Sequence, residues 1–186
     1  MKKIILFFVI TSSPLFCLCQ NVVFNDSMII AEHNKSMTQY LGKEVNNFEE
    51  RAINGKKFSK KKLSGKITLI NFWFEYCAPC IAEFEALNAL YIKYKNNNKF
   101  QFISFTFESS ATINRIMGKY ALKFPIVCVS EEKCRLLNFN QGFPVNIITN
   151  LDGKIVFINS GGPTKTDDAT RAINSTIISN LNKLLN

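Results

Sequence analysis

Histidine is nearly absent from this sequence: one residue, His33, occurs among 186. No cysteine or carboxylate pattern surrounds it, so we interpret it as a surface residue rather than a metal ligand. Internal repeats and low-complexity segments are also missing, and the chain is 47% hydrophobic and 20% charged. This composition excludes a disordered chain and predicts one domain with a buried core, which we expect to be monomeric.

Acidic residues are few, 14 against 23 lysines and arginines, which gives a formal charge of +9. Such an excess can indicate a nucleic acid or a membrane surface as partner. The most prominent lysines, at positions 56–57 and 60–62, fall in a short polar stretch, and no nucleic-acid-binding motif accompanies them. We therefore interpret the stretch as a solvated loop and expect no nucleic acid partner.

Long hydrophobic runs are missing too, and the clearest run, Ile4 to Ile10, is too short to span a bilayer comfortably. Two lysines precede it and Pro14 ends it, which is the pattern of a secretory signal peptide. Residues 1–19 are therefore predicted to be cleaved on export, leaving Gln20 as the new N-terminus.

A lipid on Cys17 or Cys19 is the alternative to simple cleavage. Phe16 and Leu18 are bulky where a lipoprotein signal prefers small residues, which disfavours it. Either way we expect a periplasmic or cell-envelope protein, in a compartment where disulfides persist.

The regular elements are expected in residues 42–186, behind a weakly patterned N-terminal extension over 20–41. The order predicted from the sequence is a hairpin near Asn54-Gly55, then strand, helix, strand, helix, strand, short helix, a second hairpin at Asp152-Gly153, and a last helix. Strand–helix–strand crossovers imply parallel pairing, and the late hairpin implies antiparallel pairing. We therefore predict an α/β domain with a central mixed β-sheet flanked by helices and an N-terminal β-hairpin extension.

The helix expected over residues 80–95 follows the buried strand expected over 67–74. Its apolar residues recur at helical spacing, and Glu83, Glu85 and Lys93 lie off this apolar stripe.

Four of the six cysteines lie beyond the predicted signal, too few for a disulfide framework. They suffice for one reactive pair and one optional second disulfide. Cys128 ends a predicted strand and Cys134 lies on the next short helix, so the two could meet the Cα separation of a disulfide. The alternative is a buried, free Cys128. A zinc site of all four is disfavoured, because five residues separate Cys128 from Cys134 and no histidine lies near.

The chemistry is expected at Cys77-Ala78-Pro79-Cys80, where a buried strand gives way to a helix. A thiol at a helix N-terminus faces free backbone N–H groups and the positive end of the helix dipole. Both stabilise the thiolate and lower its pKa from about 8.5 into a range of roughly 3.5–7.5. Pro79 falls in the first helical turn, where its missing N–H costs nothing. Cys80 comes three residues later, close enough to resolve a mixed disulfide.

This segment, within residues 71–80, resembles the active site of the thioredoxin superfamily, and is most similar to the TlpA/ResA-type exported thiol–disulfide oxidoreductases. Residues 83–88, Gly142-Phe143-Pro144 and 152–154 also resemble that family. The resemblance implies a thioredoxin-like fold, no cofactor and no metal. It also implies protein disulfides or dithiols as substrates and a membrane-borne electron donor as partner.

The resemblance assigns roles to individual residues. Cys77 matches the nucleophile, Cys80 the resolving thiol, and Pro144 the proline that is cis in this superfamily. Phe143 would present its backbone to a bound polypeptide. The remaining candidates are substrate contacts and residues that tune the thiols: Tyr76, Ala78 and Pro79 for the first, Asn71 and Glu75 for the second.

Asn71 stands where thioredoxin has a buried acid, so the proton acceptor for Cys80 is not identified by the sequence. Glu75 is interpreted as a surface carboxylate.

Two other functions stay open beside thiol–disulfide exchange. A thiol peroxidase is disfavoured because its cysteine usually follows Thr or Ser by three residues and proline by seven, where this chain has Phe74 and Ile70. A binding module without turnover has no need of two thiols. Because Ala78 and Pro79 bring neither a charge nor a side-chain donor, we expect a reductant rather than an oxidant.

Overall fold

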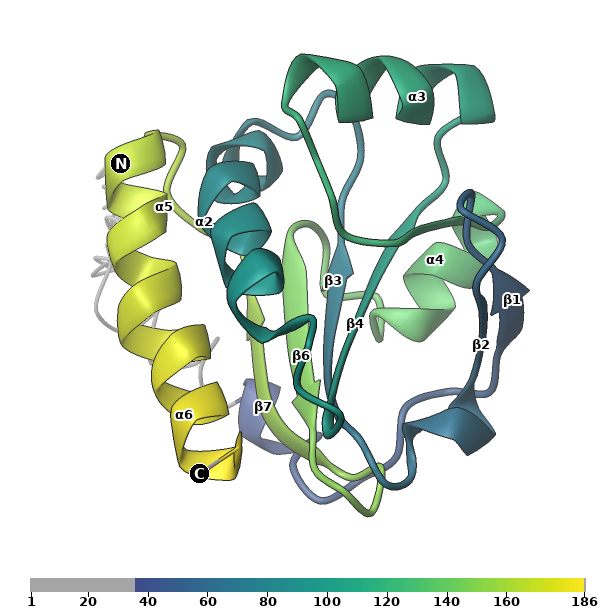
Figure 1. The fold of residues 1–186 in the computed structure, drawn as a ribbon, viewed down its shortest axis with the longest axis vertical. Coiled ribbons are helices and arrows are strands. Elements are labelled where there is room, and N and C mark those ends of the chain that lie inside the picture. The colour runs from purple at the N-terminus through teal and green to yellow at the C-terminus, as the bar shows by residue number, and fades with distance from the viewer. Residues whose placement is uncertain (1–35, 186) are drawn as a thin grey trace, which may run out of the picture.

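A computed structural model describes residues 36–185 of the chain, so the predicted signal peptide, Cys17, Cys19 and His33 lie outside the described residues. At the centre is a five-stranded sheet in the order β5-β4-β3-β6-β7 (Figure 1). Its strands are β3 (Ile67–Phe72), β4 (Phe100–Thr106), β5 (Ile126–Cys128), β6 (Val145–Thr149) and β7 (Ile155–Ser160). The first three run parallel, and β6 and β7 are antiparallel to their neighbours, which confirms the predicted mixed sheet.

The central strand β3 is buried at every residue, as its apolar run predicts. Successive side chains alternate between the two faces of a strand. Leu69 and Trp73 lie in one hydrophobic core, and Ile70 and Phe72 in the other. The polar Asn71 therefore shares a face with Leu69 and Trp73.

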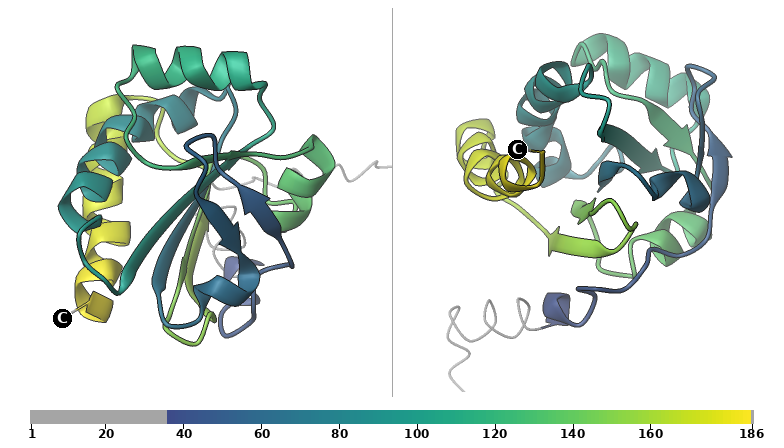
Figure 2. Two further views of the ribbon diagram at one scale, coloured as in Figure 1. Left: turned by 45° about the vertical axis from the view of Figure 1, so that its right-hand side comes forward. Right: turned by 60° about the horizontal axis from the view of Figure 1, so that its bottom comes forward.

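Helices cover both faces of the sheet (Figure 2). The first face carries α2 (Ala78–Tyr94), α5 (Thr166–Ile173), the π-helical turn η2 (Asn174–Ile178) and α6 (Ser179–Leu185), and α3 (Ser110–Lys119) adds Ile113 and Ile116 to the same core. The second face carries α4 (Glu131–Leu137), the 3₁₀ helix η1 (Lys60–Leu63) and the hairpin of β1 (Glu49–Arg51) and β2 (Lys57–Ser59). No helix within residues 36–185 is long and apolar enough to cross a membrane.

The N-terminal hairpin confirms the Asn-Gly signal. β1 and β2 pair antiparallel from Glu49–Ser59 to Arg51–Lys57, and Gly55 in the loop has a φ of 85°. Glycine adopts this left-handed conformation without the steric cost of a Cβ. Phe58 anchors the hairpin in the second core.

Candidate active site

Cys77 and Cys80 form a disulfide at the start of α2, with their Cα atoms 5.2 Å apart. Cys77 is the N-cap of the helix, and its sulfur accepts a hydrogen bond from the Cys80 N–H at 3.3 Å. Pro79 occupies the first turn, where it removes no helical hydrogen bond. Both cysteines are buried in this oxidised state. A thiolate formed at Cys77 on reduction would face the free backbone N–H groups and the positive dipole end of this helix.

Phe143 of the cis-proline loop packs against the hydrophobic core that contains Cys77 and Cys80. The Phe143–Pro144 peptide bond is cis, as the resemblance implies. Two contacts hold the loop: Asn138 Nδ2 donates to the Gly142 carbonyl at 2.8 Å, and the Gly161 N–H donates to the Pro144 carbonyl at 2.8 Å. Pro144 is buried, and Phe143 is half-buried.

The residues expected to contact substrate form an aromatic and partly exposed surface. Tyr76 is 85% exposed, Ala78 is exposed and Pro79 is half-buried. Phe143 packs edge-to-face on Phe74, with ring centroids 5.3 Å apart.

The position of Glu83 differs from the sequence prediction. Helical periodicity places Glu83 off the apolar stripe of the helix, yet it is only 3% exposed. Burial raises its pKa from 4.5 to about 7, while the hydrogen bond from Asn146 lowers it. Glu83 follows Cys80 by three residues, and residues so spaced lie on the same face of a helix. The spacing was visible in the sequence, but a charged residue on an amphipathic helix is ordinarily exposed.

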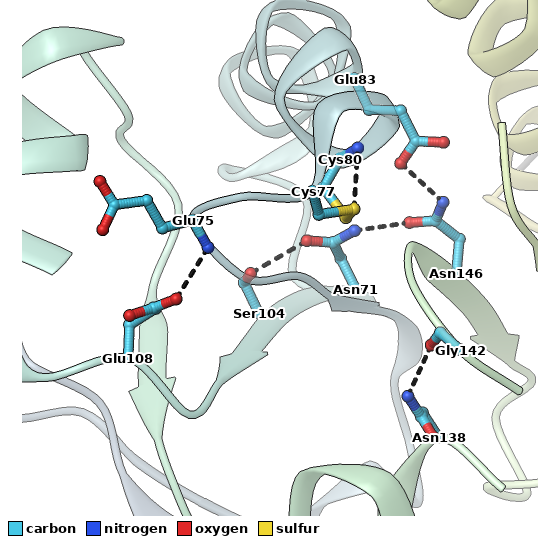
Figure 3. Close-up of a disulfide and its surroundings, with 10 residues drawn as sticks. All are labelled: Asn71, Glu75, Cys77, Cys80, Glu83, Ser104, Glu108, Asn138, Gly142 and Asn146. Carbon is cyan, nitrogen blue, oxygen red and sulfur yellow. Dashed lines mark hydrogen bonds between the residues drawn. A yellow bond between two sulfur atoms is a disulfide. The ribbon is translucent and has the colours of Figure 1, made fainter. Parts of the chain in front are cut away.

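A row of polar side chains continues from Glu83 across the sheet (Figure 3). Asn146 Nδ2 donates to Glu83 Oε2 at 3.0 Å, and Asn71 Nδ2 donates to Asn146 Oδ1 at 2.9 Å. Ser104 Oγ donates to Asn71 Oδ1 at 3.1 Å. Backbone pairing aligns Asn71 with both Ser104 and Asn146, so three neighbouring strands supply the row. Asn71 is thus linked to Glu83 through Asn146.

Glu75, which the sequence suggests is a surface carboxylate, is partly buried. Its side chain is only 16% exposed and forms an ion pair with Arg115 of α3. The pair raises the pKa of Arg115 above its ordinary value. The Glu75 N–H also donates to Glu108 Oε1 at 2.8 Å. The negative charge of Glu75, two residues before Cys77, is therefore compensated by Arg115.

The second disulfide considered for Cys128 and Cys134 is not formed, and both are free thiols. The alternative of a buried Cys128 is wrong as well: Cys128 is exposed, and Cys134 is the buried member. Burial raises the pKa of Cys134 to about 12, so it behaves as a small apolar residue. Within residues 36–185, no three His, Cys, Asp or Glu side chains are placed to hold a metal.

Comparison with known proteins agrees with this geometry. The model of the AhpC/TSA family matches residues 41–160. The chain belongs to the AhpC/TSA family. The thiol-disulfide oxidoreductase ResA of Bacillus anthracis is 32% identical over 126 residues, which cover 67% of this chain and 72% of that protein. This AhpC/TSA member is therefore a thiol–disulfide oxidoreductase similar to ResA, with Cys77 and Cys80 as its CxxC pair.

Solved structures identify the fold independently. The thioredoxin domain of a thiol-disulfide oxidoreductase from Bacteroides vulgatus superposes with a TM-score of 0.58 at 20% identity, covering 73% of this chain and 96% of that one. A thiol-disulfide oxidoreductase from Bacteroides fragilis gives a TM-score of 0.56 at 21% identity, covering 70% and 99%. The predicted thioredoxin-like fold is confirmed.

Proposed function

We propose that the protein reduces protein disulfides outside the cytoplasm, with Cys77 as nucleophile, Cys80 as resolving thiol and Glu83 as proton acceptor. The observation that carries the proposal is a buried carboxylate one helical turn beyond a buried cysteine of the reactive pair. A carboxyl whose pKa lies near 7 can both take and return a proton under ordinary conditions.

The first step begins from the reduced pair. The Cys77 thiolate attacks one sulfur of a substrate disulfide, a new S–S bond joins protein to substrate, and the old bond breaks. The displaced substrate sulfur leaves as a thiolate and takes a proton from solvent. The Cys80 N–H and the N-terminus of α2 stabilise the attacking anion.

The second step releases the substrate. Cys80 gives its thiol proton to the Glu83 carboxylate and attacks the Cys77 sulfur, so the Cys77–Cys80 bond forms as the mixed disulfide breaks. The second substrate thiolate leaves and takes up a proton, and Glu83 returns its own proton to solvent. Two electrons have passed from the cysteine pair to the substrate, and the disulfide in the structure is the product state.

The substrate chain would lie against Phe143 and Pro144. A cis-proline loop leaves the backbone of the preceding residue free to pair with an extended polypeptide. Tyr76, Ala78 and Pro79 border the same disulfide and would contact the substrate from the helix side.

The direction of exchange rests on how weakly the thiolate is held. Ala78 and Pro79 supply no charge, and Glu75 is paired with Arg115, so the helix N-terminus is the main stabilising group. A less stabilised thiolate favours the disulfide, which corresponds to a potential nearer about −270 mV than about −120 mV. Such a reductant needs recharging by a membrane-borne electron donor.

Export is supported by the sequence of residues 1–19, with its two lysines and short apolar run. The mature protein is expected to begin at Gln20 or to carry a lipid on Cys17 or Cys19. N-terminal sequencing of the protein recovered from the cell envelope tests this, and a mature chain that begins at Met1 would overturn it.

Turnover tests the proposed activity. The purified protein supplied with dithiothreitol should reduce a protein disulfide, and Cys77→Ser should abolish the reaction. Equal turnover by Cys77→Ser would refute the assignment. Consumption of hydrogen peroxide that does not need Cys80 would instead indicate a peroxidase. Equilibration in glutathione and dithiothreitol buffers tests the direction, and a potential above about −170 mV would reverse it.

A further inference from the structure

The polar row beneath the disulfide has a fixed direction. An ionised carboxylate only accepts hydrogen bonds, so Asn146 must turn its NH₂ group toward Glu83. The Asn146 oxygen then faces Asn71, which must also present its NH₂ group, and the Asn71 oxygen is left to accept from Ser104. Every donor in the row therefore points toward Glu83.

The backbone holds this row in place. Asn71 lies directly opposite Ser104 in β4 and opposite Asn146 in β6, and all three side chains are fully or almost fully buried. Chains of buried hydrogen bonds polarise one another, because each donor that is itself an acceptor becomes a stronger donor. The bond that reaches Glu83 is thus the end of a preorganised chain.

Resting on the proposed function, we propose that Asn146 is the positioning residue of Glu83. The chain Ser104–Asn71–Asn146 favours the ionised form of the carboxylate and orients it to accept the Cys80 proton. Asn146 occupies one oxygen of Glu83 by hydrogen bonding. The other, Oε1, would lie 3.2 Å from a Cβ added at Gly162, so the glycine leaves room for it.

Among the groups around Glu83, Asn146 is the one whose interaction lowers the pKa of its carboxyl. Its pKa responds to burial, which raises it, and to the Asn146 bond, which lowers it. Cys77 and Cys80 at the start of α2 are joined in a disulfide and do not titrate, and β3, β4 and β6 contribute the neutral polar row. At the start of α5, Asp167 is exposed and Asp168 is paired with Arg171.

The test is the ionisation of Glu83 in the oxidised protein, followed by ¹³C NMR of its labelled carboxyl group across pH. Asn146→Leu removes the donor, so the midpoint should rise by about one pH unit from its value near 7. At pH 7, resolution of the mixed disulfide should slow about five-fold, because about a tenth rather than half of Glu83 is then ionised. Ser104→Ala, at the far end of the row, should raise the midpoint by a smaller amount.

Thr149→Val is the matched control. It lies on the same strand, is fully buried, and its hydroxyl oxygen has no hydrogen-bond partner in the described structure. It makes the same polar-to-apolar change and should leave the midpoint unchanged.

An unchanged midpoint in folded Asn146→Leu would overturn the proposal, as would an equal shift in Thr149→Val. If Asn146→Leu does not fold, Ser104→Ala decides: an upward shift supports the chain, and none refutes it. The titration needs no turnover, so its result stands apart from the Cys77→Ser assay that tests the proposed function.

Discussion

Replacing Glu83 by glutamine should change the pH dependence of stability. The free energy of unfolding of Glu83→Gln, measured relative to that of the wild type, should be higher at neutral and alkaline pH than at acid pH. Burial raises the pKa of this carboxyl from 4.5 to about 7. Between these values the folded protein keeps a proton that the unfolded chain releases. Wild-type stability therefore falls as pH rises through this window, and the loss is complete above pH 7.

The size of the effect follows from the width of the window. A difference of about 2.5 pH units, at about 1.4 kcal/mol each, corresponds to about 3 kcal/mol. Glutamine keeps the shape of the side chain and carries no ionisable group, so Glu83→Gln lacks this loss. Any cost of placing an amide beside Asn146 does not change with pH, and it cancels when two pH values are compared.

Urea unfolding of the oxidised proteins at pH 4 and pH 8 measures this difference. The gain of Glu83→Gln over wild type should be larger at pH 8 than at pH 4 by about 3 kcal/mol. Glu85→Gln is the matched control, because Glu85 is exposed on the same helix and should show no such difference. A gain in Glu83→Gln that is the same at both pH values would refute the reasoning.

Two further substitutions test the surroundings of the site. Gly162→Ala would place a Cβ 3.2 Å from Glu83 Oε1 and should slow resolution of the mixed disulfide in stopped-flow assays. Gly118→Ala is the control, because a Cβ at Gly118 meets open space and should leave the rate unchanged. Gly118→Ala should also stabilise α3 by about 0.5–1 kcal/mol. Equal rates in the two variants would contradict the proposed crowding. Arg115→Ala leaves the charge of Glu75 uncompensated two residues before Cys77, so the measured potential should become more negative, and a more positive potential would argue against the pairing.

The sequence predicts the frame of the molecule well, because its strongest signals are local. The apolar run before Cys77 predicts a buried strand, and the helical spacing of apolar residues after Cys80 predicts the helix that follows it. The Asn54-Gly55 and Asp152-Gly153 turns place the antiparallel pairs β1–β2 and β6–β7. The helical segment expected at the end of the chain is present and begins with α5 at Thr166, whose N-cap, Lys165, makes no side-chain capping bond.

The proton acceptor could not be predicted in the same way, because it depends on contacts between distant segments. Glu83 accepts a hydrogen bond from Asn146 of β6 and lies near Gly162 in the segment after β7, and helical periodicity says nothing of either. Asn71 and Asn146 are 75 residues apart, and only the register of β3 with β6 shows that they meet. Likewise, the exposure of Cys128 depends on its place at the end of the edge strand β5.

The most direct test of the account is to identify which sulfur bonds to substrate. Cys80→Ala keeps the proposed nucleophile and removes the resolving thiol, so incubation of the reduced variant with a protein disulfide should trap a stable mixed disulfide. Peptide mapping by mass spectrometry should place that bond on Cys77. No adduct, or one on the exposed free thiol of Cys128, would contradict the claim that this protein exchanges disulfides through Cys77.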